Sequence, residues 1–144
     1  MPSRRPNDVT ASDPARSAAR EIRRLSEALA LARFDQVIDE AGEWVMWLGA
    51  AVPRARPDGR REAAALREAS RGFERWLDQN MGLLLLLGYD LVRRAEVVRS
   101  AALVCLREAG RPRGDLDAGR RALEASLLVM ERALARSRAD VRRT

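Results

Sequence analysis

Through most of the chain, apolar residues recur at alternating intervals of three and four positions. This is the pattern of a helix that buries one face in a bundle. No segment alternates apolar and polar residues at period two, so we expect no strand. The pattern predicts an all-α fold, an antiparallel up-down four-helix bundle with a long first helix. Its clearest row is Leu31, Phe34, Ile38, Ala41, Val45, Leu48 and Val52.

The ends of the helices are marked by capping residues and by proline. The first helix is expected to begin at Asp13–Pro14, an N-cap followed by proline at the first helical position, and to end near Ala51. Residues 1–12 are predicted to be a disordered N-terminal tail, and residues 13–142 a single helical-bundle domain. The segments VPRARPDGR (52–60) and GRPRGD (110–115) are expected loops.

Residues 60–109 admit two interpretations, one helix or a hairpin of two. One helix would be ~75 Å long and would outrun its partners. A turn at LDQNMG (77–82) is therefore favoured, with Asn80 and Gly82 as plausible turn residues. The third helix then runs from about 83 to 109 with the row Leu84, Gly88, Leu91, Ala95, Val98, Ala102 and Cys105.

Stacking these helices leaves part of the first one without a neighbour. If the two proline-containing loops share one end of the bundle, residues 80–83 lie at the other end, level with roughly 29–33. Residues 14–28 would then project by ~20 Å or more. Their apolar row also differs from the one that follows. Such a segment needs a cover, which could be a second subunit, another protein or its own fold-back.

Five consecutive leucines in MGLLLLLGYD (81–90) raise the question of a membrane segment. The charge-free window from Gln79 to Tyr89 is too short, because a spanning helix needs ~20 residues. Five leucines cover more than one helix face, so Leu83, Leu85 or Leu86 should face outward. For the tryptophan pair at 44 and 47, packing in or at the edge of the core is the default interpretation, and an interface anchor is the alternative. The predicted protein interface is Ile22, Leu25, Leu29, Trp44, Trp47, Leu85 and Leu86.

Several kinds of chemistry are excluded because the chain has no histidine. Ser-His-Asp and Cys-His catalysis and histidine metal sites are ruled out, and no glycine-rich loop opens a helix. The acidic stripe of Asp35, Asp39 and Glu43 is either a cation site or, as favoured, a solvated face that pairs with arginines of another helix, such as Arg93, Arg94 or Arg99. We expect no enzyme, no catalytic or cofactor-binding residue and no metal. Cys105 is the only cysteine and is expected in the core. A single cysteine allows no internal disulfide, and this suits the reducing cytoplasm.

The net charge of +6 comes from arginine alone and gathers at the ends of the chain. Most arginines have acidic neighbours at helical spacing and are expected to form a salt-bridged, solvated face. The last turns of the final helix are the exception, since their arginines outnumber their acids. The candidate nucleic-acid-binding residues are therefore Arg132, Arg136, Arg138, Arg142 and Arg143.

One helix ends at VPRARPDGRRE, a hairpin of about sixty residues follows, and the final helix is basic. This layout resembles that of the small basic four-helix bundles typified by accessory proteins of diversity-generating retroelements. The resemblance covers about 30–142 in element order and length. It implies a ring-forming bundle that binds a reverse transcriptase and nucleic acid. The glycine-rich, tryptophan-containing end of that family is absent from ERALARSRADVRRT, and no functional residue carries over.

The expected function is therefore a non-enzymatic interaction module. It would act as a self-associating or scaffold subunit of a larger assembly, with a homo-oligomer or a protein partner and no membrane span. The alternative is a basic accessory subunit that binds RNA or DNA, possibly with a reverse transcriptase, through the last helix.

Overall fold

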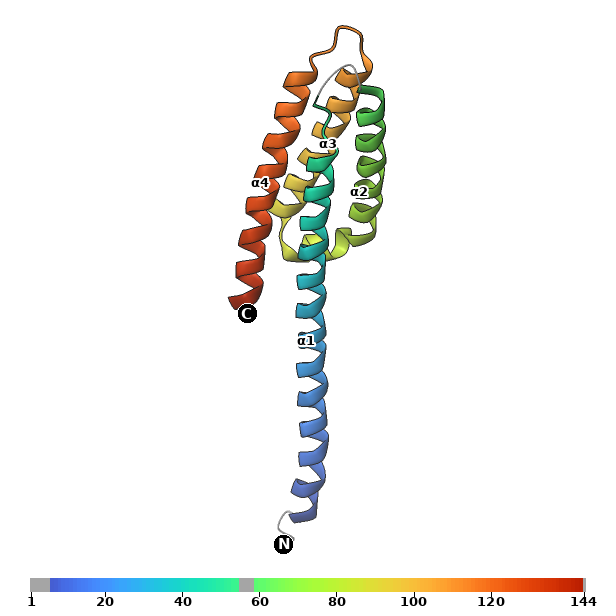
Figure 1. Ribbon diagram of the computed structural model, residues 1–144. Coiled ribbons are helices and arrows are strands. Elements are labelled where there is room, and N and C mark those ends of the chain that lie inside the picture. The colour runs from blue at the N-terminus through green and yellow to red at the C-terminus, as the bar shows by residue number, and fades with distance from the viewer. Residues whose placement is uncertain (1–5, 55–58, 144) are drawn as a thin grey trace. The chain divides into compact units, whose positions relative to one another are not determined.

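The computed structural model describes residues 6–54 and 59–143. Within these ranges the chain forms four helices and no strand: α1 (Pro6–Ala50), α2 (Gly59–Leu87), α3 (Tyr89–Gly110) and α4 (Leu116–Arg143) (Figure 1). The predicted all-α four-helix bundle with a long first helix is confirmed. The chain divides into two compact units, Met1–Arg33 and Phe34–Thr144, which are described separately.

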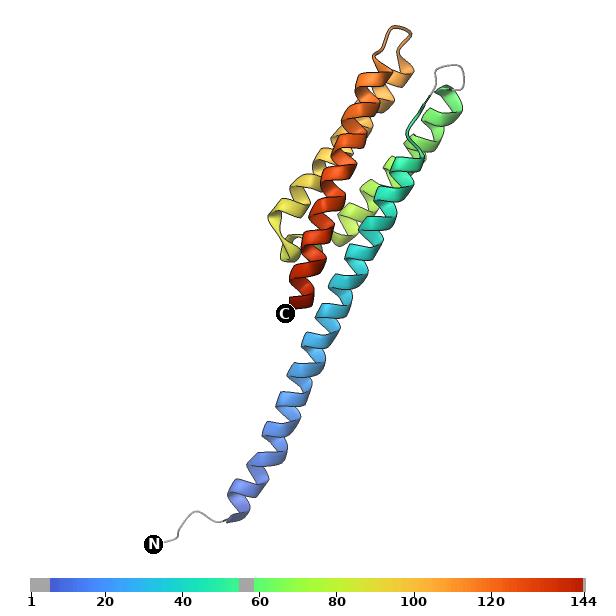
Figure 2. The same cartoon turned by 60° about the vertical axis from the view of Figure 1, so that its left-hand side comes forward.

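In the unit Phe34–Thr144 the helices lie side by side and alternate in direction. The end of α1, the start of α2 and the loop after α3 lie at one end, and the connection between α2 and α3 lies at the other (Figures 1 and 2). The apolar rows meet inside, as the spacing predicts. The buried residues of α3 are those of the predicted row: Leu91, Ala95, Val98, Ala102 and Cys105.

Helix α4 begins directly after the loop expected at 110–115. Asp115 is its N-cap, since its Oδ1 accepts a hydrogen bond of 3.0 Å from the Ala118 N–H. Glu108 accepts the Asp115 N–H at 2.8 Å and so ties the end of α3 to the start of α4. Gly119 then brings the two helices close together. A Cβ at this position would lie only 3.1 Å from the Cα of Cys105.

The turn between α2 and α3 lies at Gly88, and the prediction of a turn at 80–83 is wrong. Asn80 lies inside α2, where its side-chain Nδ2 donates to the Trp76 carbonyl at 2.9 Å. Leu84 is fully buried within the same helix. Gly88 has φ 151° and ψ 143°, a backbone conformation that residues with a Cβ rarely adopt. The helix therefore continues through the leucines and stops where glycine permits a reversal.

The start predicted for the first helix at Asp13–Pro14 is also wrong, because α1 begins at Pro6 and contains Pro14. Proline removes one backbone N–H from the hydrogen-bond ladder. The neighbouring sequence is rich in alanine, the strongest helix former, which favours continuation. Of the predicted disordered tail, residues 1–5 lie outside the described part of the chain, and residues 6–12 belong to α1.

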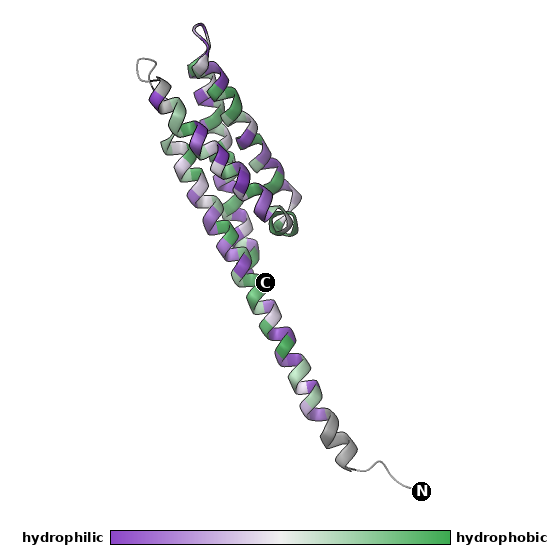
Figure 3. Ribbon diagram, turned by 90° about the vertical axis from the view of Figure 1, so that its right-hand side faces the viewer, coloured by the Kyte–Doolittle hydropathy of each residue, from purple (hydrophilic) through white to green (hydrophobic). Residues whose placement is uncertain are grey.

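In the unit Met1–Arg33, every side chain from Asp13 to Ala30 is exposed. Ile22, Leu25 and Leu29 are 65%, 53% and 66% exposed. Figure 3 shows hydrophobic and hydrophilic residues interleaved along this part of α1. We call residues 13–33 the arm. Its apolar row is solvated, and the boundary after Arg33 lies close to where the row of α1 changes register.

None of the helices in the described ranges has an apolar stretch long enough to cross a membrane.

Candidate protein interface

Aromatic side chains join the last turns of α1 to α2. The rings of Trp44 and Trp47 meet edge to face, with centroids 4.8 Å apart, and Trp44 also lies 6.3 Å from Phe73. Trp44 is half-buried over Gly72, where a Cβ would come within 2.5 Å of the indole ring. Trp47 is 49% exposed. Of the two tryptophans predicted at the interface, Trp44 therefore packs between α1 and α2, whereas about half of the surface of Trp47 is exposed to solvent.

A hydrogen-bond network lies beside this aromatic cluster. The Trp76 indole N–H donates to Glu40 at 2.8 Å, and the side chain of Gln36 donates to the other oxygen of the same carboxylate at 3.1 Å. The indole of the buried Trp76 thus has its acceptor, and Glu40 is used in joining α2 to α1.

The acidic stripe of α1 meets the last helix. Asp39 accepts a hydrogen bond of 2.6 Å from Arg138 of α4. The expected pairing of the stripe with an arginine of another helix is confirmed at Asp39, but the partner belongs to α4 and is none of the suggested Arg93, Arg94 and Arg99. Arg94 pairs with Asp90 at 3.5 Å, and Arg99 pairs with Glu74 and Glu96 at 3.3 and 3.4 Å. Spacing within α1 showed that the acids share a face, but not which helix faces them.

No group of three or more His, Cys, Asp or Glu side chains is placed to hold a metal ion in the part of the chain that the structure describes.

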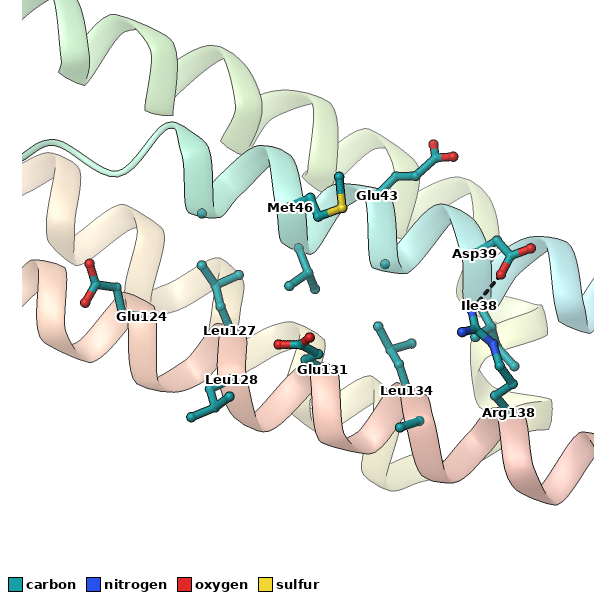
Figure 4. A pocket seen from close by; sticks show the side chains of 14 residues that line it. Ile38, Asp39, Glu43, Met46, Glu124, Leu127, Leu128, Glu131, Leu134 and Arg138 are labelled. Carbon is teal, nitrogen blue, oxygen red and sulfur yellow. Dashed lines mark hydrogen bonds and ion pairs between the residues drawn. The ribbon is translucent and has the colours of Figure 1, made fainter.

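An open groove of about 970 Å³ separates α1 from α4 (Figure 4). Its floor is apolar, and Figure 4 shows Leu127 and Leu134 pointing from α4 toward α1. Met46 and Leu128 also line it and are 69% and 47% exposed. The acids that line it are Asp39, Glu43, Glu124 and Glu131.

The Asp39–Arg138 ion pair crosses this groove near one end (Figure 4). Glu124 and Glu131 stand seven residues apart on α4 and so share a face. Neither has an ion pair with any residue that the structure describes. The groove therefore combines an apolar floor with acidic groups that are free to meet positive charge.

Sequence patterning missed this groove. Met46 and Leu128 lie outside the core rows of their helices and were the available signal, because apolar residues off the core row have no place inside the bundle. The separation of α1 and α4 is a tertiary property that the spacing within one helix does not report.

The leucine block divides between core and surface. Leu84 is fully buried, whereas Leu85 and Leu86 are 49% and 75% exposed. The expected outward orientation is confirmed for Leu85 and Leu86, whereas Leu83 is half-buried against the core. Tyr89, just beyond the turn at Gly88, is 69% exposed. Large apolar side chains thus stand in water around the connection between α2 and α3.

The basic end of α4 is partly used within the bundle. Arg136 pairs with Asp90 at 3.7 Å and Arg138 with Asp39 at 2.6 Å, while Arg143 lies 4.0 Å from Asp140. Arg132 and Arg142 are exposed and form no ion pair with the described residues. The five predicted nucleic-acid-binding arginines therefore include two that link α4 to other helices of the same bundle.

Comparison with known proteins identifies no relative. No protein-family model, no curated protein and no solved structure matches the chain. The resemblance to retroelement accessory bundles therefore stays a prediction, and function has to be argued from the surface of the molecule itself.

Proposed function

We propose that this protein is a non-enzymatic, self-associating helical-bundle module, which acts as a subunit of a larger assembly in the cytoplasm. The observation that carries the proposal is the arm. Its side chains from Asp13 to Ala30 are all exposed, and yet it carries a regular apolar row.

A helix whose apolar row faces water is less stable than the same helix packed against a partner. Most of the stability of helices in proteins comes from packing an apolar face and not from intrinsic helix propensity. Full burial of each leucine or isoleucine contributes roughly 1.5–3 kcal/mol relative to exposure. Covering Ile22, Leu25 and Leu29 would therefore stabilise both the arm and the assembly that covers it.

Exposed apolar side chains elsewhere on the bundle support the same proposal. Leu85, Leu86 and Tyr89, grouped around the connection between α2 and α3, are 49%, 75% and 69% exposed, and Trp47 is 49% exposed. Single exposed apolar residues are ordinary, but grouped ones mark surfaces for protein partners. Tryptophan in particular is enriched among the residues that dominate binding energy at interfaces.

The proposal is tested with a charge placed in the apolar row of the arm. Changing Leu25→Asp and Leu29→Asp together should convert the oligomer to a monomer by light scattering, while helicity measured by circular dichroism is largely kept. The matched control places the same two charges on another face of the arm, through Ala19→Asp and Ala30→Asp, and should keep the wild-type mass. A wild-type chain that is monomeric at every concentration, or a leucine variant with wild-type mass, would contradict the proposal.

The alternative proposal is binding of RNA or DNA through the end of α4, and it is supported by exposed Arg132 and Arg142, which form no ion pair with the described residues. Each phosphate contact should add roughly 0.7–0.9 to the slope of log affinity against log salt. If changing Arg136, Arg138, Arg142 and Arg143 together to Gln left nucleic-acid binding intact, this alternative would fail.

A further inference from the structure

We infer that the groove between α1 and α4 is the docking site for the arm of a second copy of this chain. The inference rests on the proposed self-association and names its surfaces. Arm residues 13–33 of one molecule would lie between α1 and α4 of the other.

The groove has the chemistry of a receptor for an amphipathic helix. Met46 and Leu128 expose apolar surface that faces water, and a helix with an apolar row would cover it. Glu124 and Glu131 form no ion pair with the residues described. The preferred occupant is therefore apolar on one side and positively charged at its edges.

The arm fits this description in charge. It contains five arginines and three acids. Arg24 pairs with Glu21 at 2.5 Å, whereas Arg23 and Arg33 form no ion pair with residues that the structure describes. The long arginine side chain can extend from the flank of a helix while its stem packs on apolar surface. A basic arm and a groove in which acids outnumber the single Arg138 thus attract each other.

The arm also fits the groove in length. The α1 wall runs from Ile38 to Gly49, and the α4 wall from Glu124 to Arg138. At 1.5 Å per residue these walls are ~17 and ~21 Å long. The apolar row of the arm, from Ile22 through Ala32, spans ~15 Å. Three turns of helix would therefore fill the groove.

A second copy of the chain is the simplest source of the helix that would occupy the groove. The arm and one wall of the groove belong to the same helix, α1. An arm could enter its own groove only if that helix broke, whereas the arm of another molecule needs no such change. Exchange of arms gives each copy one arm donated and one groove filled, as in a two-fold symmetric dimer.

Charge reversal on each side, followed by mixing, tests this pairing. One full-length variant carries Glu124→Arg and Glu131→Arg in the groove, and the other carries Arg23→Glu and Arg33→Glu in the arm. Each alone should associate at least ten-fold more weakly than wild type in a light-scattering dilution series. In an equal mixture the wild-type arm meets the wild-type groove and the acidic arm meets the basic groove, so association should return to the wild-type level.

The control variant reverses two exposed acids of α2 that lie outside the groove, Glu68→Arg and Asp78→Arg, and should associate as wild type does. If wild type associates but the groove variant is indistinguishable from it, the inference is overturned and the proposed self-association stands. If mixing restores nothing, the inference is likewise overturned. A monomeric wild-type chain overturns both.

A cross-link gives a second readout if a charge-reversal variant fails to fold. Copies with Leu25→Cys are mixed with copies carrying Leu128→Cys and are oxidised. A disulfide-linked heterodimer should form, and it should exceed the product obtained with Ala64→Cys on α2 by at least ten-fold. Cys105 is buried and should not compete. Equal yields from the two pairs would overturn the inference.

Discussion

Gly72 shows how one missing Cβ positions a large side chain. The indole of Trp44 occupies the space beside it, and this contact holds α1 against α2 through the aromatic cluster. Glycine in a helix interior has a conformational cost of roughly 0.5–1 kcal/mol relative to alanine. Its presence here is therefore explained by the close approach of the ring and not by a turn.

Gly72→Ala should lower the free energy of unfolding by about 1–3 kcal/mol, because the added Cβ would meet Trp44 at 2.5 Å and overpack the site. Gly42→Ala is the matched control, since no atom lies within 4 Å of a Cβ there. It should leave stability unchanged or raise it by up to about 1 kcal/mol. Urea unfolding of both variants is the measurement, and equal stabilities would argue against the close packing of Trp44.

The buried thiol of Cys105 makes the stability of the fold depend on pH. Burial raises the pKa of its thiol, with Arg120 lowering it in part and Glu124 raising it. A folded-state pKa above the unfolded value of about 8.5 stabilises the fold below that pH, and the stabilisation is lost as pH rises through the folded pKa. Between pH 7 and pH 10 the wild type should therefore lose more stability than Cys105→Ala, as urea midpoints would show. Parallel losses in the two proteins would contradict this assignment.

At the scale of elements, the rows of apolar residues predicted the helices and their buried faces well. Ile38, Leu66 and Val98 are fully buried, as their spacing implies. The break in the middle of the chain was predicted but misplaced, because two glycines near it offer similar local signals. The choice between them is made by tertiary packing. Leu77 and Leu84 are both buried on one continuous α2, which would be lost if the chain turned at Gly82.

These two glycines can be compared directly. Gly82 is exposed inside α2 with nothing near its absent Cβ, so Gly82→Ala should stabilise the protein by up to about 1 kcal/mol. Gly88 has φ 151°, and Gly88→Ala should destabilise it by roughly 1–3 kcal/mol through backbone strain. Thermal unfolding of the two variants separates these outcomes. Destabilisation by the change at 82 would place the turn where the sequence first suggested it.

For the molecule as a whole, the exposed apolar row of the arm could be predicted from the sequence, but not the groove that we propose as its docking site. Ile22, Leu25 and Leu29 could be found because they break the register of the row that follows them. The groove between α1 and α4 depends on how far apart two helices lie that are distant in sequence. The pairing of Asp39 with Arg138 depends on the same spacing. Helical periodicity carries information about one helix at a time, and so it identifies faces more readily than the clefts between them.

The central claim is that another molecule covers the arm, and amide hydrogen exchange measures this cover directly. An uncovered helix opens readily, so its amides exchange fast, whereas a docked one is protected. In wild-type protein, exchange across residues 13–33 should slow by at least ten-fold when the concentration is raised from the monomeric to the associated range. Exchange at the buried positions of α3 should not change. Fast exchange of the arm at both concentrations would contradict the account.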